Sequence, residues 1–115
     1  VIQGEVLDVA VDIRQSSPTC GQYIAEILSS DNRKQLYIPE GFAHGFLALE
    51  KENIISYNCT NYRNANSEIT LNFNDVDIGI KWPKIKPILS NKDANGLSFK
   101  NFITKIKNNF YLRLA

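Results

Sequence analysis

The sequence predicts a single domain that is an all-β sandwich or barrel, followed by a helical tail. Short runs rich in β-branched and aromatic residues recur along residues 1–97, at the spacing of roughly 8–12 residues that is typical of such folds. Clusters of Gly, Pro, Asn, Asp and Ser separate these runs, and a helical pattern appears only in the tail. With 115 residues, of which 43% are hydrophobic, the chain is long enough for one modest core.

The first strand is predicted from strict alternation within the segment VIQGEVLDVAVDIR, residues 1–14. A turn cluster at residues 15–18 ends it. One face of this strand carries four apolar side chains, Leu7, Val9, Val11 and Ile13, and the other face carries Val6, Asp8, Ala10 and Asp12.

Further strands are predicted wherever a short apolar or aromatic run is bounded by turn residues. Pro39 ends one of them, because proline cannot donate a hydrogen bond to a sheet. The predicted strands cover residues 23–28, 35–38, 45–49, 54–60 and 69–74, and an extended segment at 82–89 and a turn at 91–96 follow.

Residues 98–115 are predicted to form an amphipathic C-terminal helix, distinct from the core at residues 1–97. Ser98 is suited to cap its N-terminus, and lysines occupy the face opposite the apolar one. The apolar residues recur at steps of three and four, at Phe99, Phe102, Ile103, Ile106 and Phe110. We expect the helix to pack on the barrel or on a partner in a dimer.

Charge and composition argue against several classes of function. A formal net charge of +1 disfavours nucleic-acid binding, which needs a clustered basic surface. No apolar run approaches the roughly 20 residues that span a bilayer, and no signal-peptide pattern is present. Cys20 and Cys59 are interpreted as free thiols of a cytoplasmic protein. Because the chain lacks methionine and begins at Val1 inside a strand-like run, we expect further sequence to precede it.

The only histidine, His44, lies in the stretch IPEGFAHGF, residues 38–46. We expect strands 45–49 and 54–60 to form a hairpin, in which Phe46 pairs with Tyr57. His44 would then lie diagonally across from Tyr57 on the same face, with Cys59 nearly opposite His44. The hairpin therefore predicts a histidine, a tyrosine and a phenylalanine that project together into a barrel interior.

The residue types in this hairpin favour acid–base chemistry over the alternatives. One histidine and one cysteine are too few ligands for a usual zinc or iron site, so no metal is expected. No nucleophile elbow and no phosphate-binding glycine loop is present in the sequence. A tyrosine can donate a proton in a suitably arranged site. From the residues alone, His44 and Tyr57 are either such a pair or ordinary core residues.

Several motifs in order resemble one enzyme family. GEVLDVAVDIRQSSPT is followed by NRKQLYIPEGFAHGFLAL, and TNYR, NFND, IGIKWP and ILSNKDANG follow with nearly the same spacing as in that family. Over residues 1–96 the chain resembles the dTDP-4-dehydrorhamnose 3,5-epimerases. The resemblance implies a cupin-type jelly-roll barrel and a dimer that acts without metal or cofactor. The implied substrate is a dTDP-4-keto-6-deoxy sugar, which is epimerised in dTDP-rhamnose biosynthesis.

The resemblance also implies roles for individual residues. Tyr57 would be the general acid, and Asp93 would orient the catalytic histidine and stabilise its charged form. Tyr62 would stack on the thymine ring, with Arg63 beside it where many family members have a second aromatic residue. The remaining implied substrate contacts are His44, Glu68 and Lys92.

In the family, the histidine that acts as base lies upstream of the position that matches Gly4. His44 matches a different histidine, so we expect the 115 residues by themselves to be inactive or nearly so. Two hypotheses stay open at this point. The chain is part of a nucleotide-sugar 3,5-epimerase, an isomerase, or it is an inactive cupin module that binds a nucleotide sugar or a partner.

Overall fold

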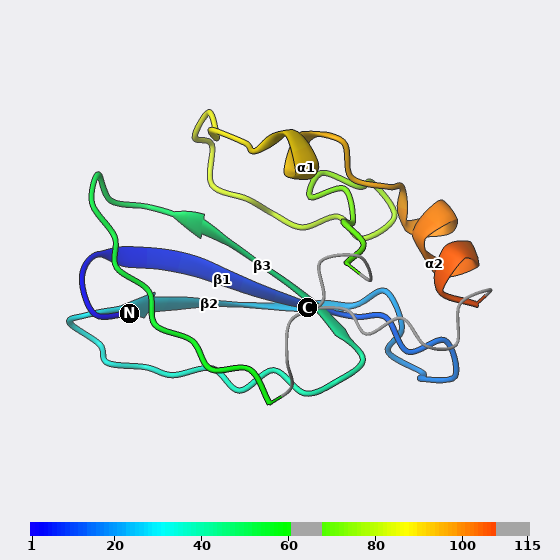
Figure 1. Ribbon diagram of the computed structural model, residues 1–115, viewed down its shortest axis with the longest axis horizontal. Helices are drawn as coiled ribbons and strands as arrows, with labels where there is room; N and C mark the ends of the chain where they lie inside the picture. The colour runs from blue at the N-terminus through cyan, green and yellow to red at the C-terminus, as the bar shows by residue number, and fades with distance from the viewer. Residues whose placement is uncertain (61–67, 108–115) are drawn as a thin grey trace.

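A three-stranded antiparallel sheet forms the centre of the protein in the computed structural model, which describes residues 1–60 and 68–107. The strands are β1 (Glu5–Asp12), β2 (Tyr23–Ser29) and β3 (Phe42–Ala48). Their order in the sheet is β2-β1-β3, so β1 is the central strand (Figure 1). Two short helices, α1 (Asn91–Ala94) and α2 (Phe99–Lys107), follow later in the chain.

The alternation predicted for the first strand is confirmed. Leu7, Val9, Val11 and Ile13 are buried and form the core together with Ile78 and Phe102. The opposite face of β1 is buried as well, although it carries the carboxylates of Asp8 and Asp12. A central strand has neighbours on both edges, so polar side chains on its second face must find partners within the protein.

The core face of the sheet is covered by the chain that follows residue 68. Phe102 of α2 is fully buried in the core cluster. Ser98 caps α2, since its Oγ accepts a hydrogen bond from the Asn101 backbone N–H at 3.2 Å. The buried carboxylate of Asp75 accepts a second bond from the Phe99 N–H at 2.9 Å, which ties the start of the helix to the loop before it. The helix therefore begins where the sequence predicted.

The predicted hairpin between residues 45–49 and 54–60 is wrong. β3 pairs with β1 over seven residue pairs, from Val6↔Ala48 to Asp12↔Phe42. Residues 54–60 form no strand, and Ile54 makes only an isolated bridge to Gln3. The physical reason is that alternation reports which residues suit a strand but does not choose the strand's partner.

Other predicted elements also differ from the structure. Residues 35–38 and 69–74 are not strands, and in the second segment only Leu71 forms a bridge, to Leu97. The turn predicted at 91–96 contains the single helical turn α1, capped by Ser90. An apolar run shows that a segment can be buried but not that another strand pairs with it, and apart from the bridge at Leu71 these runs are irregular chain. Residues 108–115 of the predicted tail lie outside the described part of the chain.

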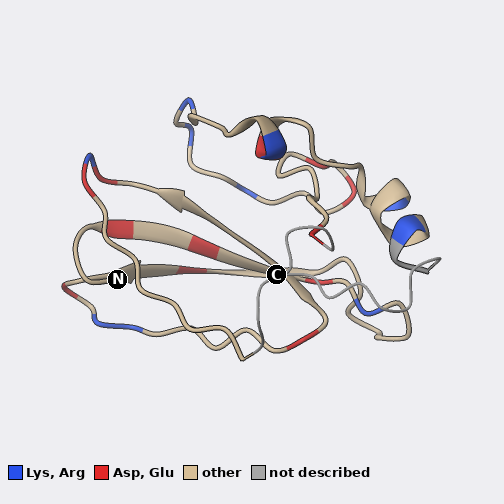
Figure 2. Ribbon diagram, viewed as in Figure 1, with Lys and Arg blue, Asp and Glu red and all other residues tan. Residues whose placement is uncertain are grey.

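Charged residues of both signs are spread over the molecule. Acidic positions lie on β1, whereas α2 carries lysines, and α1 holds an acidic and a basic residue side by side (Figure 2). Among the residues that the structure describes, no helix is long and apolar enough to cross a membrane.

Candidate active site

His44 lies on the face of the sheet that is turned away from the core. In the register of the sheet it is opposite Ala10, and Phe46 is opposite Asp8, so these four side chains share one face. Nε2 of His44 and Oδ1 of Asp8 form a hydrogen bond diagonally across the two strands. The Asp8 side chain is 10% exposed and that of His44 is 31% exposed. The pair therefore has a buried acceptor and a partly open imidazole.

Apolar side chains surround this pair on the open face. The ring of Phe46 lies 6.2 Å from the imidazole, centroid to centroid, and is about half exposed. Ile24 of β2, opposite Ala10, is more than half exposed. A face with exposed apolar groups around a hydrogen-bonded imidazole suits a ligand that has both apolar and polar parts.

Asp8 is a site residue that sequence reasoning did not single out. The signal was present, because a carboxylate stands among Val6, Ala10 and other apolar residues of a central strand. A buried carboxylate requires a partner, and the partner proves to be the chain's single histidine. The contact depends on the pairing of β1 with β3, which the sequence did not predict.

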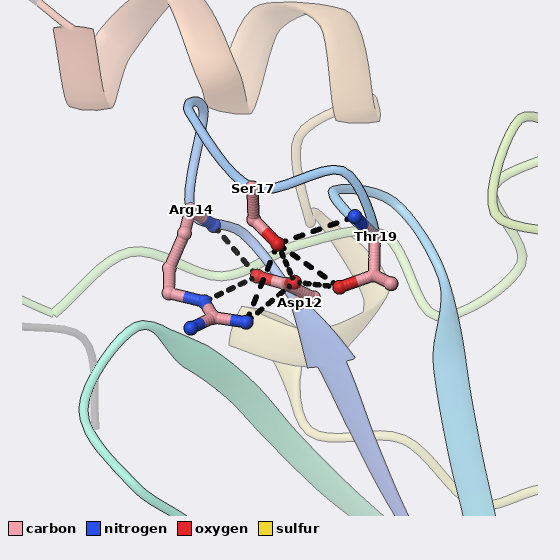
Figure 3. A network of polar contacts seen from close by, with 4 residues as sticks. All are labelled: Asp12, Arg14, Ser17 and Thr19. Atoms are coloured by element: carbon pink, nitrogen blue, oxygen red, sulfur yellow. Dashed lines mark hydrogen bonds and ion pairs between the residues drawn. The ribbon is translucent and has the colours of Figure 1, made fainter.

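A second carboxylate, Asp12, organises the turn that follows β1 (Figure 3). Its side chain accepts hydrogen bonds from Nε and Nη2 of Arg14, each at 3.0 Å, and from the Arg14 backbone N–H. The hydroxyls of Ser17 and Thr19 donate two more, at 2.7 and 2.5 Å. These bonds, chiefly those from the Arg14 side chain, hold the pKa of Asp12 well below its usual range, although burial acts in the opposite direction.

This turn also holds the beginning of β3. The guanidinium of Arg14 lies over the Phe42 ring, with 4.9 Å from Cζ to the ring centroid. Gly41 has φ +89°, and a Cβ there would lie 2.6 Å from Cγ of Arg14. The Ile13 N–H donates to the Gly41 carbonyl at 3.0 Å. The glycine and first phenylalanine of IPEGFAHGF therefore dock against Arg14, a few residues before His44.

Two predicted substrate contacts meet at α1. Nζ of Lys92 donates a short hydrogen bond to Oε2 of Glu68, whose side chain is 10% exposed, whereas that of Lys92 is 53% exposed. Asp93, the next residue, is exposed, and its backbone N–H donates to Oγ of Ser90 at 3.1 Å. Glu68 therefore holds the ammonium group of Lys92, while about half of the lysine side chain remains accessible.

Tyr57 does not share an enclosed lumen with His44 in this structure. It lies in the irregular segment after Ile54, and it is 75% exposed. Cys59 is exposed and free, and the predicted pairing that would place it opposite His44 is not formed. Tyr62 and Arg63, predicted to stack on a base, lie outside the described residues.

Among the described residues, no three His, Cys, Asp or Glu side chains are grouped so that they could hold a metal ion. Among the ionisable side chains of the open face, His44 and Asp8 form the pair described above, and Glu26 is ion-paired with Lys34. The His44–Asp8 pair can form hydrogen bonds to a ligand and can hold a proton at a fixed place.

Comparison with known proteins decides the family. A sequence model of the dTDP-4-dehydrorhamnose 3,5-epimerases matches residues 1–101. The chain belongs to this family. It is 48% identical over 98 residues to the dTDP-4-dehydrorhamnose 3,5-epimerase of Shigella flexneri, covering 85% of the chain and 54% of that relative. It is 53% identical over 92 residues to that of Salmonella typhimurium, covering 79% of the chain and 50% of that relative.

Solved epimerases share the fold. The dTDP-4-dehydrorhamnose 3,5-epimerase of Elizabethkingia anophelis matches with a TM-score of 0.83 and 46% identity, covering 87% of this chain and 56% of that one. The dTDP-6-deoxy-D-glucose-3,5-epimerase of Legionella pneumophila, solved in complex with dTDP-4-keto-L-rhamnose, matches with a TM-score of 0.78 and 42% identity, covering 87% and 54%. These epimerases are cupin-like jelly rolls, so the predicted all-β, cupin-type fold class is confirmed. The chain spans about half the length of these epimerases.

Proposed function

We propose that the protein acts as a dTDP-4-dehydrorhamnose 3,5-epimerase on a dTDP-4-keto-6-deoxy sugar. The observation that carries this proposal is the family match over residues 1–101. The bound dTDP-4-keto-L-rhamnose of the Legionella epimerase, a relative of 42% identity, supports the class of substrate. On this proposal the protein is a cytoplasmic enzyme that forms a homodimer.

The reaction needs only acid–base chemistry beside a ketone. The C4 carbonyl acidifies the hydrogens on C3 and C5, so a base removes one of them and leaves an enolate. A proton returned to the opposite face of the same carbon inverts that centre. No electrons leave the substrate, and the proton balance closes at each carbon. The proposal therefore requires no metal and no redox cofactor.

The residues of this chain would divide the remaining tasks. Tyr57 returns the proton as general acid, and the exposed position of its phenol leaves it accessible to a ligand. Asp93 orients the histidine that acts as base, which the family places before the position of Gly4. His44, supported by Asp8, contacts the sugar from the open face of the sheet.

The nucleotide end would be bound near α1. Lys92 is the cation best placed for the diphosphate, because Glu68 holds its ammonium group while half of its side chain stays exposed. Tyr62, with Arg63, would stack on the thymine ring. Both kinds of contact fix the sugar for chemistry without taking part in the proton transfers.

Solvent deuterium incorporation tests the function. The complete gene product is incubated in D2O with dTDP-4-keto-6-deoxyglucose, and the sugar is followed by mass spectrometry and NMR, while calorimetry measures binding of dTDP. The proposal expects deuterium at C3 and C5 together with dTDP binding. Binding of dTDP without incorporation would show instead a module that only holds a nucleotide sugar. Absence of both would contradict the proposal altogether.

A further inference from the structure

The environment of Asp8 determines which nitrogen of His44 can meet a ligand. Asp8 lies on the central strand β1, is 7% exposed, and accepts its hydrogen bond from Nε2 of His44 on the edge strand β3. A carboxylate only accepts hydrogen bonds, so the nitrogen that faces it must carry a proton. A histidine without such a partner exchanges between its two neutral tautomers.

The other ring nitrogen, Nδ1, diverges from Nε2 around the ring, so it is directed away from the buried carboxylate. Among the described residues the contacts of His44 are Asp8 and the ring of Phe46, and neither occupies Nδ1. The imidazole is 31% exposed on the face where Phe46 and Ile24 are also exposed. In the neutral ring, Nδ1 therefore offers a lone pair to whatever binds that face.

We propose that Asp8 is a positioning residue that fixes His44 as the Nε2–H tautomer, so that Nδ1 accepts a hydrogen bond from a hydroxyl of the bound sugar. The ligand part of this proposal rests on the proposed function, whereas the tautomer part does not. The arrangement makes His44 selective, because an Nδ1 lone pair favours a hydroxyl, which can donate, over a group that can only accept.

The support that Asp8 gives is asymmetric. Among the residues that the structure describes, His44 is its hydrogen-bond partner, and the central strand fixes its position from both sides. His44 lies on an edge strand and has one shared bond to orient it. The carboxylate of Asp8 is thus held in place by the sheet, and it orients the imidazole of His44.

Nitrogen NMR of the imidazole tests the tautomer directly. The chain has one histidine, so a long-range ¹H–¹⁵N spectrum of the labelled protein contains one imidazole pattern. Above the pH at which the ring is charged, we expect a protonated, pyrrole-type shift at Nε2 and a pyridine-type shift at Nδ1. An unprotonated Nε2 or fully averaged shifts would overturn the proposal.

Variants separate the role of Asp8 from simple folding. Asp8→Leu removes the acceptor, so its imidazole shifts should become averaged. Asp8→Asn keeps a carbonyl oxygen but adds an NH2 that can donate to Nε2, so its shifts should lie between the wild-type pattern and full averaging. Glu26→Gln is the control, because Glu26 is opposite Asp8 on β2 and is ion-paired with Lys34. A pattern that is unchanged in Asp8→Leu would overturn the proposal. Should Asp8→Leu fail to fold, the wild-type pattern and Asp8→Asn still decide it.

Ligand binding tests the second part, with dTDP-glucose and dTDP as probes of the complete gene product. Loss of one aimed hydrogen bond should raise the Kd for dTDP-glucose about fivefold in Asp8→Leu and leave that for dTDP unchanged. On addition of dTDP-glucose to the wild type, the shift of Nδ1 should move more than that of Nε2. Equal weakening for both ligands would overturn the hydroxyl contact. If neither ligand binds while the tautomer is as expected, the proposed function fails and the role of Asp8 stands.

Discussion

Arg14 stacks its guanidinium on the ring of Phe42, 4.9 Å from Cζ to the ring centroid, and so connects the turn after β1 to the first residue of β3. The same guanidinium is bonded to Asp12, the last residue of β1. One arginine therefore ties together two neighbouring strand ends. His44 lies two positions after Phe42 in β3, so we expect this contact to help to position the imidazole that reaches Asp8.

Gly41→Ala should destabilise the protein. Residue 41 has φ +89°, and the new Cβ would lie 2.6 Å from Cγ of Arg14, so either the arginine or the strand must move. Left-handed backbone of this kind costs a non-glycine residue roughly 1–3 kcal/mol. Urea unfolding measures the loss. Gly45→Ala is the control, because residue 45 lies within β3 and no atom lies within 4 Å of its new Cβ, so this change should be neutral or slightly stabilising.

Gly41→Ala should also disturb the His44–Asp8 hydrogen bond, since the strain enters at the start of β3. The imidazole resonances of the single histidine report this without ambiguity. An unchanged imidazole spectrum alongside lower stability would show that the turn stabilises the fold but does not position His44.

Asp12→Asn should remove part of the acid sensitivity of the fold. The pKa of Asp12 is lowered in the folded state, chiefly by hydrogen bonds from the Arg14 side chain. The stabilisation is therefore fully present above the ordinary carboxyl pKa of about 3.9 and is lost as the pH falls below it toward the lower folded value. Urea midpoints measured between about pH 5 and 2.5 should fall more steeply for the wild type than for Asp12→Asn, which is weaker at neutral pH. Parallel curves would contradict this role.

The predicted and observed structures agree where the information is local. Alternation placed Leu7, Val9, Val11 and Ile13 in the core, and Ser98 marked the start of α2. The hairpin failed because the partner of β3 is β1, which is separated from it in the chain by the whole of β2. The Asp8–His44 contact joins residues 36 positions apart, so no pattern within either strand could reveal it.

The family resemblance predicted substrate contacts but not the residues that support them. It predicted His44, Glu68 and Lys92 as substrate contacts, and the structure joins the last two in an ion pair. The resemblance did not predict roles for Asp8 or Arg14, because these residues contact His44 and Phe42 and were not predicted to contact a substrate. Supporting residues of this kind become visible only when the strands are paired.

Lys92→Gln should weaken binding of dTDP about tenfold, because on the proposed function its ammonium group meets the diphosphate. Glu68→Gln should weaken binding less, since the lysine keeps its charge and loses only the carboxylate that holds it. Lys86→Gln, another exposed lysine, is the control for overall charge. Calorimetry at two salt concentrations measures all three. Equal losses for Lys86→Gln and Lys92→Gln would mean that net charge alone attracts the nucleotide.

Tyr57→Phe should lose epimerisation and keep nucleotide binding. The change removes one hydroxyl from a side chain that is 75% exposed, so the stability of the fold should hardly change. A positioned general acid contributes about 100- to 10,000-fold to a rate, and kcat of the complete gene product should fall within that range. Removal of the proton by the base does not involve Tyr57. Deuterium should therefore still exchange into the starting epimer in this variant, although net inversion is lost. Tyr37→Phe, at an equally exposed tyrosine outside the proposed site, should behave as the wild type. Full activity of Tyr57→Phe would assign the returning proton to another group.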